Sequence, residues 1–163
     1  MNGKLLISAL LVFCAIFGAA LWWFQTRAYY QPVTDVTEIT VFGDVFAVSD
    51  YQGIDADTSP LKMRACFTVD WDYWPSDQFR EVAEPLTAPD WFDCFDAPQI
   101  TADILIGKAT AILADDNAPY GFSRFIAQYE DGRAFMWRQI NECGTAAFAG
   151  EPLPADCPPK PES

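Results

Sequence analysis

The hydrophobic residues of this chain are gathered most densely near its N-terminus. Residues 5–24 contain no charged side chain, and Lys4 and Arg27 flank them. A helix of about 20 residues spans about 30 Å, which is the thickness of the hydrocarbon core of a bilayer. The pattern therefore predicts a transmembrane anchor over residues 1–27, with its short start in the cytoplasm, followed by a spacer over residues 28–36.

A cleaved signal peptide is the alternative for this segment, with the small residues Gly18, Ala19 and Ala20 as the cleavage site. The apolar run is, however, longer than the roughly 7–15 residues of a signal-peptide core. It also continues into Trp22 and Trp23, and tryptophan is typical of the interfacial belt at the end of a membrane helix. We therefore favour an uncleaved anchor.

Beyond the spacer, the pattern changes to short runs of apolar and polar positions. Residues 37–48 are rich in β-branched and aromatic side chains, with a turn or bulge expected at Gly43 and Asp44. Residues 50–60 are polar and predict a turn-rich connection. In residues 61–69, apolar and polar side chains alternate, which predicts a half-buried strand.

Capping residues indicate two helices in the middle of the chain. Ser76 is suited to cap a short helix that ends at Glu84. Asp96 is suited to cap a second helix over residues 97–106, with a proline in the first turn and Gly107 at the end. A loop rich in proline and aromatic residues is expected between the two helices.

The clearest pattern follows the second helix. Residues 109–114 read as a strand, and residues 123–129 and 133–139 flank a Glu-Asp-Gly turn, which is a hairpin signal. A helix followed by three such strands predicts an α+β domain with an antiparallel sheet over residues 37–150. Three arginines are expected to brace the hairpin by pairing across strands: Arg124, Arg133 and Arg138.

The end of the chain lacks periodicity. After Cys143 no helical or strand pattern continues, and residues 151–163 contain five prolines. Such a segment is predicted to be an extended tail that only Cys157 pins to the domain.

The composition narrows the functional classes. The chain has 163 residues, with 23 Asp and Glu against 10 Lys and Arg and a formal net charge of −13. Such a surface repels nucleic acid and anionic lipid, so neither is expected as a partner. The chain contains no histidine, which excludes Ser-His-Asp and Cys-His catalysis and histidine-ligated metal sites. No cofactor is expected.

Four cysteines follow the anchor: Cys66, Cys94, Cys143 and Cys157. An even number in a small domain is typical of disulfides formed outside the cytosol. No pair has the C-x-x-C spacing of zinc ribbons, thioredoxin-type sites or c-type haem attachment. Three pairings are possible, and we prefer Cys66–Cys94 with Cys143–Cys157 because each closes a local loop. Four free buried thiols in a cytosolic domain are the alternative.

One motif resembles a catalytic one. Ser59 and Lys62 match S-x-x-K, the serine nucleophile and lysine base of penicillin-binding enzymes. That chemistry requires a helix start, whereas here a strand is expected to follow, and the companion S-D-N and K-T-G motifs are absent from the sequence. A hydrolase is therefore the weakest hypothesis, and we expect no catalytic residue.

Carboxylates at alternate positions resemble calcium loops in two places. Asp55 and Asp57 form the first run; Asp70 and Asp72 form the second, with Glu81 at its twelfth position. In both runs a proline stands where such loops require glycine. We interpret these side chains as solvated turn carboxylates and predict no metal site.

Two segments combine aromatic and acidic side chains. The first comprises Asp70, Trp71, Asp72, Tyr73 and Trp74, and the second includes Asp90, Trp91 and Asp93. A Cys66–Cys94 disulfide would bring the two segments close together. Aromatic faces with carboxylates favour a cationic ligand or a basic partner surface. In the alternative interpretation, Trp91 and Phe95 fill the core around the disulfide while the acidic groups face water.

Several blocks of this sequence resemble a known family. These are SPLKMRACF at 59–67, LTAPDWFDCF at 86–95, DGR at 131–133 and QINECG at 139–144. They are similar to an uncharacterised, membrane-anchored domain family of alphaproteobacteria, over nearly the whole chain. The resemblance implies a location in the cell envelope. Because that family has no established activity, it implies no functional residue.

These observations lead to one main functional hypothesis. We expect a single-pass protein of the bacterial inner membrane with its C-terminal domain in the periplasm. The main hypothesis is a non-enzymatic accessory or assembly protein of an integral membrane complex. A periplasmic binding domain for a cationic small molecule is the alternative.

Overall fold

The computed structural model describes residues 3–70 and 82–161, and it divides the chain into two units, Met1–Tyr30 and Gln31–Ser163. The first unit contains helix α1 (Gly3–Thr26), which has no buried side chain. Its 24 residues correspond to about 36 Å at 1.5 Å per residue. By length and composition α1 could cross a membrane, although a signal sequence meets the same criterion.

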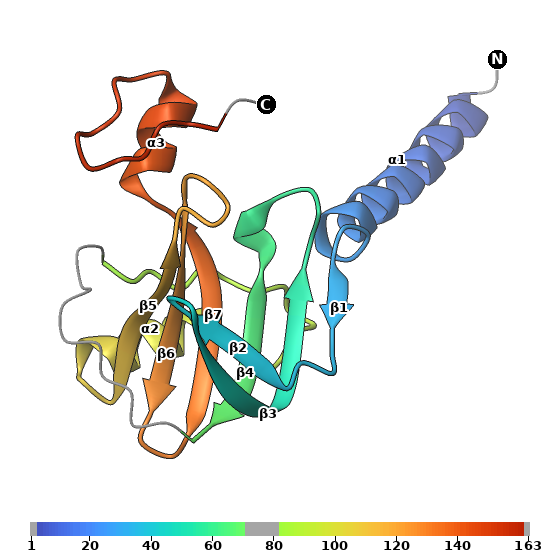
Figure 1. The fold of residues 1–163 in the computed structure, drawn as a ribbon. Coiled ribbons are helices and arrows are strands. Elements are labelled where there is room, and N and C mark those ends of the chain that lie inside the picture. Colours follow the sequence, from blue (N-terminus) through green and yellow to red (C-terminus); the bar gives the residue numbers. More distant parts are fainter. Residues whose placement is uncertain (1–2, 71–81, 162–163) are drawn as a thin grey trace. The chain divides into compact units, whose positions relative to one another are not determined.

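The second unit is built on an antiparallel sheet of seven strands (Figure 1). The strands are β1 (Gln31–Val33), β2 (Glu38–Val41), β3 (Asp44–Asp55), β4 (Arg64–Val69), β5 (Ala109–Asp116), β6 (Phe122–Tyr129) and β7 (Arg133–Ile140). Their order is β1-β3-β4-β7-β6-β5, and β2 pairs with β3 outside this path. With its short helices, the unit has the α+β architecture predicted from the sequence.

Strand β3 is longer than the pattern predicts. The expected turn-rich connection over residues 50–60 is wrong in its first half, because β3 continues to Asp55. The pairing of β3 with β4 shifts between Ser49 and Gln52, and Asp50 has a φ of 52°. This bulge lies at the start of the polar stretch from which the sequence predicted a turn-rich connection. On its other edge β3 pairs first with β2 and, beyond the bulge, with β1, while β4 pairs with β3 on both sides of the bulge.

The β2–β3 hairpin closes over one face of the sheet. At its tip, the Phe42 N–H donates a 2.8 Å hydrogen bond to the Ala114 carbonyl at the end of β5. Between the hairpin and the sheet lies the first core cluster, whose largest contributions include Val41, Phe67, Ile112 and Met136. Every residue of β4 except Thr68 is buried, so the half-buried strand predicted over residues 61–69 is buried on both faces.

A second core cluster covers the other face of the sheet. Helix α2 (Ala97–Leu105) and the preceding loop pack against β4, β6 and β7 there (Figure 1). Trp137 is fully buried at its centre, and its ring stacks on Phe125 with the centroids 5.9 Å apart. Phe95 approaches Trp137 edge-on at 6.4 Å. This layer explains why the polar positions of β4 are covered too.

Helix α2 matches its sequence prediction, and Asp96 accepts a hydrogen bond from the Gln99 N–H as the expected cap. The helix predicted from Ser76 to Glu84 falls mainly on residues 71–81, outside the described residues, and residues 82–84 are not helical. A short 3-10 turn, η1 (Pro60–Lys62), precedes β4.

A third helix, α3 (Glu142–Ala149), occupies a segment for which the sequence predicted no periodic structure. Asn141 caps its start by accepting a 2.8 Å hydrogen bond from the Gly144 N–H, and Gly150 ends it in the left-handed conformation. Four of its eight residues are alanine or glycine, so the helix carries almost no apolar stripe that a pattern search could find.

Glycine is required where α3 meets the loop before β6. A Cβ atom built on Gly144 would lie 2.1 Å from the Gly121 carbonyl oxygen.

The tail beyond α3 is held more firmly than expected. Besides the disulfide at Cys157, the Tyr120 hydroxyl donates a 3.1 Å hydrogen bond to the Pro158 carbonyl.

Candidate functional site

Two disulfides hold the loops of the domain. Cys66 on β4 is bonded to Cys94, and Cys143 on α3 is bonded to Cys157 in the tail. This is the pairing preferred from the sequence. The bonds span 28 and 14 residues, so each stabilises the folded state by about 3–4 kcal/mol in the chain-entropy model. Cys14, in α1, is the free cysteine among the described residues.

The second acidic and aromatic segment lines a shallow groove of about 290 Å³. Asp90, Asp93 and Asp96 are exposed along it, and Phe92 and Phe95 form part of its wall. Trp91 is half-buried against Phe92. Phe95 belongs to the second core cluster, as the alternative interpretation of this segment expected, whereas Trp91 lies outside that cluster.

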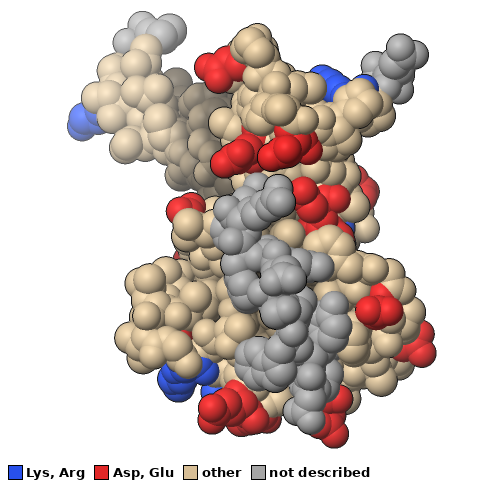
Figure 2. All heavy atoms as spheres, turned by 60° about the vertical axis from the view of Figure 1, so that its left-hand side comes forward, with Lys and Arg blue, Asp and Glu red and all other residues tan. Residues whose placement is uncertain are grey.

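The first acidic and aromatic segment is described only at its beginning. Asp70 is exposed directly after β4. Trp71, Asp72, Tyr73 and Trp74 lie outside the described residues, so their expected proximity to the groove stays a prediction. Carboxylates are distributed widely over the face of the molecule drawn in Figure 2, in keeping with the net charge of −13.

Arg64 fixes the loop that carries the groove. Its side chain is 3% exposed, its Nε donates a 2.7 Å hydrogen bond to the Leu86 carbonyl, and its Nη1 donates to Leu61 and Met63. The guanidinium also lies 5.7 Å from the centroid of the Phe95 ring. The sequence pattern does not reveal this role, because an arginine at a polar position of an alternating strand is expected to face water.

Gln139 fixes the same loop at its start. Its side-chain oxygen accepts hydrogen bonds from the Glu84 N–H at 2.8 Å and from the Trp137 indole at 3.2 Å. Its Nε2 donates to the Val82 carbonyl at 2.8 Å. Together with the Cys66–Cys94 disulfide, Gln139 and Arg64 hold residues 82–96 against the second core cluster.

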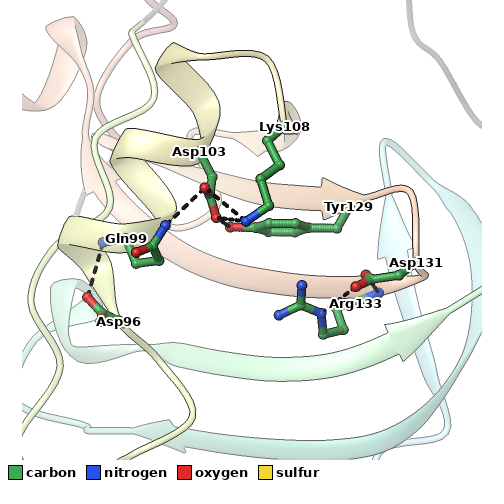
Figure 3. A network of polar contacts seen from close by, with 7 residues as sticks. All are labelled: Asp96, Gln99, Asp103, Lys108, Tyr129, Asp131 and Arg133. Atoms are coloured by element: carbon green, nitrogen blue, oxygen red, sulfur yellow. Dashed lines mark hydrogen bonds and ion pairs between the residues drawn. The ribbon is translucent and has the colours of Figure 1, made fainter.

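A buried carboxylate joins α2 to the sheet. Asp103 is 3% exposed and accepts hydrogen bonds from the Tyr129 hydroxyl at 2.8 Å and from Gln99 Nε2 at 3.0 Å. The Lys108 ammonium lies 3.3 Å from the same carboxylate. Figure 3 shows Asp103 pointing from α2 toward Tyr129, with Lys108 approaching from the turn between α2 and β5.

This network shifts the pKa of both partners. The hydrogen bond from Tyr129 is the main cause that lowers the pKa of Asp103, with Lys108 and Gln99 adding to it. Burial is the main cause that raises the pKa of Tyr129, and the Asp103 carboxylate adds to it. At neutral pH the pair is therefore an ionised aspartate and a protonated tyrosine. In these states the Tyr129 hydroxyl can donate its hydrogen bond to the Asp103 carboxylate.

The Ser59 and Lys62 side chains form hydrogen bonds with residues close to them in the chain. The Ser59 hydroxyl accepts a hydrogen bond from the Leu61 N–H and caps η1, and Lys62 Nζ donates to the Thr58 hydroxyl at 3.1 Å. Asp55 accepts a hydrogen bond from the Ala56 N–H, and Asp57 accepts one from the Gln31 side-chain amide. Within residues 3–70 and 82–161, no three His, Cys, Asp or Glu side chains converge as metal ligands.

Comparison with known protein families identifies a match that covers most of the chain. A family of unknown function, DUF6446, matches residues 35–158. The chain belongs to this family. The DUF6446 match begins after α1 and includes both disulfides, the groove and the Asp103 network. No curated protein and no solved structure matches the chain, so the geometry of the DUF6446 domain itself must carry any functional argument.

The three hairpin arginines of the DUF6446 domain differ in their partners. Arg124 pairs with Asp115 on the neighbouring strand at 2.5 Å, as expected. Arg138 lies 3.5 Å from Asp55, which reaches it from β3. Arg133 departs from the prediction, because it pairs with Asp131 in its own turn at 2.8 Å and its guanidinium lies 4.9 Å from the centroid of the Tyr129 ring.

Proposed function

We propose that the protein is a single-pass protein of the bacterial inner membrane whose DUF6446 domain lies in the periplasm. The apolar helix α1, which could span a bilayer, supports the anchor. The two disulfides support an oxidising compartment for the domain. A short cytoplasmic N-terminus completes this topology.

The role that fits this topology is that of a non-enzymatic accessory or assembly protein of a membrane complex. The observation that carries the proposal is the groove bordered by Asp90, Asp93 and Asp96. Its carboxylates are exposed, while the loop beneath them is held by a disulfide and by Arg64. A preorganised acidic surface favours a basic partner surface through complementary charge. The partner would be the periplasmic part of an integral membrane complex.

Co-purification from native membranes tests this proposal. The tagged full-length protein is extracted in mild detergent, and the proteins that accompany it are identified and quantified. We expect a stoichiometric membrane complex with the wild type and its loss with the double variant Asp90→Lys/Asp93→Lys. The variant Asp44→Lys, which reverses an exposed charge at the start of β3, is the control. A solitary wild-type protein would contradict the accessory role.

A second candidate function uses the same groove for a cationic small molecule. Phe92 and Phe95 lie beside the three aspartates there, and an aromatic face with carboxylates attracts quaternary and primary ammonium groups. A thermal-shift screen of the full-length protein with choline, betaine and polyamines distinguishes the two functions. A shift that disappears in Asp90→Asn would favour the small molecule; no shift at millimolar ligand would count against it.

A further inference from the structure

A separate charged cluster lies at one end of the sheet. Asp55 ends β3, Asp115 is one residue from the end of β5, and Arg124 and Arg138 stand near the corresponding ends of β6 and β7. Arg124 is paired in register with Arg138 on one side and with Asp115 on the other. The antiparallel register therefore gathers two arginines and two aspartates in one row.

These four side chains lie on the inner face of the sheet. Ile126 and Met136, two residues from Arg124 and Arg138, belong to the first core cluster, and side chains two apart on a strand share a face. Tyr51 packs against this cluster and interacts electrostatically with Arg124, Asp55 and Arg138, while burial raises its pKa. On this face of the sheet, the charged row therefore borders the first core cluster.

Hydrogen bonding within the row is incomplete. The Nε atoms of Arg124 and Arg138 and the Oδ1 atom of Asp115 are buried without a hydrogen-bond partner in the described structure. Arg138 Nη1 is 3.5 Å from Asp55 Oδ2, whereas charge-assisted N–H···O bonds are about 2.7–2.9 Å long. Arg124 is held better, since its Nη2 contacts both Asp115 and the Thr40 carbonyl. The Arg138 Nε is shielded from solvent, so a ligand would reach the exposed part of its guanidinium, whose contact with Asp55 is long; the side chain is 22% exposed.

Two arginines directly opposite each other destabilise a pair of strands unless nearby negative charges offset their repulsion. The two aspartates neutralise their charge, but they leave the Nε donors unused. Packing alone would be served better by apolar side chains at these inward positions, because a partly satisfied buried polar network costs free energy. Arg138 and Asp55 are the members of this row that also line a cavity.

Arg138 also lines a cavity of about 200 Å³, whose other walls are residues of β1, the end of β3 and the segment that follows it. Asp55 and Asp57 contribute carboxylates to its wall, and Gln31 contributes an amide that donates to Asp57. Pro32 and Val33 supply apolar wall. The cavity thus presents a guanidinium and two carboxylates within one small volume, together with a surface suited to a small aliphatic side chain.

We propose that this cavity binds a small zwitterion of the α-amino acid class. The ligand carboxylate is recognised by the Arg138 guanidinium, whose planar fork matches a carboxylate. The ligand ammonium is recognised by Asp57 and Asp55, and a short side chain packs on Pro32 and Val33. The volume limits the ligand to small members such as glycine, alanine and serine. This site is separate from the groove and adds a ligand-sensing role to the proposed accessory function.

Calorimetric titration of the full-length protein in detergent micelles tests the site. Glycine, L-alanine and L-serine are the probes, and acetate and methylammonium each present half of the zwitterion. We expect saturable binding of at least one amino acid, with acetate and methylammonium at least 10-fold weaker. Titratable binding of acetate or methylammonium with the same affinity would overturn the proposal, as would the absence of saturable binding of all three amino acids at 10 mM.

Two variants locate the binding. Asp57 is exposed, so Asp57→Asn leaves the fold intact and should weaken amino acid binding at least 10-fold. Asp44→Asn removes the same charge at the opposite end of β3 and should leave the affinity unchanged. Equal affinities for the wild type and Asp57→Asn would overturn the assignment. Arg138→Lys keeps the charge but loses the planar fork, and it should weaken glycine binding while the protein retains its two disulfides.

Discussion

The Tyr129 hydroxyl donates a 2.8 Å hydrogen bond to Oδ2 of Asp103, and this contact ties α2 to β6 at a buried point. The tie holds one side of the layer that covers Trp137 and Phe125. Because α2 has only nine residues, it would be marginal alone and depends on such tertiary contacts. The acidic groove lies directly before this helix, so the tie also fixes the C-terminal end of the groove.

The Tyr129→Phe variant should be less stable at neutral pH and less sensitive to acid. The pKa of Asp103 is lowered in the folded state, so its contribution to stability is present above the unfolded value of about 4 and is lost as pH falls through the folded value. Urea denaturation between pH 7 and pH 2 measures this. At pH 7 the urea midpoint of the variant should be lower than that of the wild type. Between pH 7 and pH 2 the midpoint of the variant should fall less than that of the wild type.

The control for this experiment is Asp131→Asn. Asp131 and Arg133 form an exposed pair, and such pairs contribute about 0–1 kcal/mol. Its neutral-pH midpoint should stay close to that of the wild type. A Tyr129→Phe protein with the wild-type midpoint at pH 7 would show that the hydrogen bond does not tie the helix.

Gly144→Ala should destabilise the domain by about 1–3 kcal/mol, the usual cost of overpacking. The added Cβ would meet the Gly121 carbonyl oxygen at 2.1 Å, and the atoms that it would contact belong to the backbone of Gly121 rather than to a flexible side chain. Chemical denaturation with the disulfides intact measures the change. Thr145→Ala, at the exposed neighbouring position, should stay within about 0.5 kcal/mol of the wild type. Equal stability of the Gly144 and Thr145 variants would contradict the close approach.

Gln139→Leu should loosen the loop before the groove. The change removes the acceptor of the Trp137 indole and of the Glu84 N–H, and each buried donor left unsatisfied costs about 1–3 kcal/mol. Hydrogen exchange monitored by mass spectrometry should show faster exchange in residues 82–90 and little change in β5. Unchanged protection of residues 82–90 would mean that the disulfide alone holds the loop.

The double variant Cys66→Ser/Cys94→Ser should lose about 2–5 kcal/mol of stability, as small domains do when a native disulfide is removed. The loop that carries the groove would then be held by Arg64 and Gln139 only. Thiol labelling after denaturation without a reductant provides the companion measurement. Wild-type protein isolated from membranes should label at Cys14 alone, and labelling at the other four cysteines would contradict an oxidising compartment.

The sequence predicted best those elements whose signals are local. Capping by Asp96, the Glu-Asp-Gly hairpin and the apolar run of α1 each depend on residues close in the chain, and the structure contains all three elements. The disulfide pairing followed from the same preference for short loops. Helix α3 escaped prediction because alanine and glycine leave no apolar stripe, although Asn141 three residues before Gly144 was a readable capping signal.

The remaining features depend on contacts distant in the sequence. The length of β3 depends on its pairing with β4, which continues past a bulge with a shifted register, and the burial of Arg64 follows from a loop that crosses the outer face of β4. The carboxylates at Asp90 and Asp93 could be identified from composition, but the cavity at Arg138 could not. It is formed by strands that are more than 80 residues apart along the chain.

The position of β4 between β3 and β7 has a consequence for how the nascent chain matures. During synthesis β4 emerges beside β3 at once, but its other edge stays open until β7 has been made. When Cys94 has been synthesised, Cys66 is already available as its partner, whereas Cys143 has not yet been synthesised. Each native disulfide thus joins cysteines that are consecutive in the domain. Oxidation in the order of emergence gives the correct pairing, so maturation should require an oxidase but no disulfide isomerase.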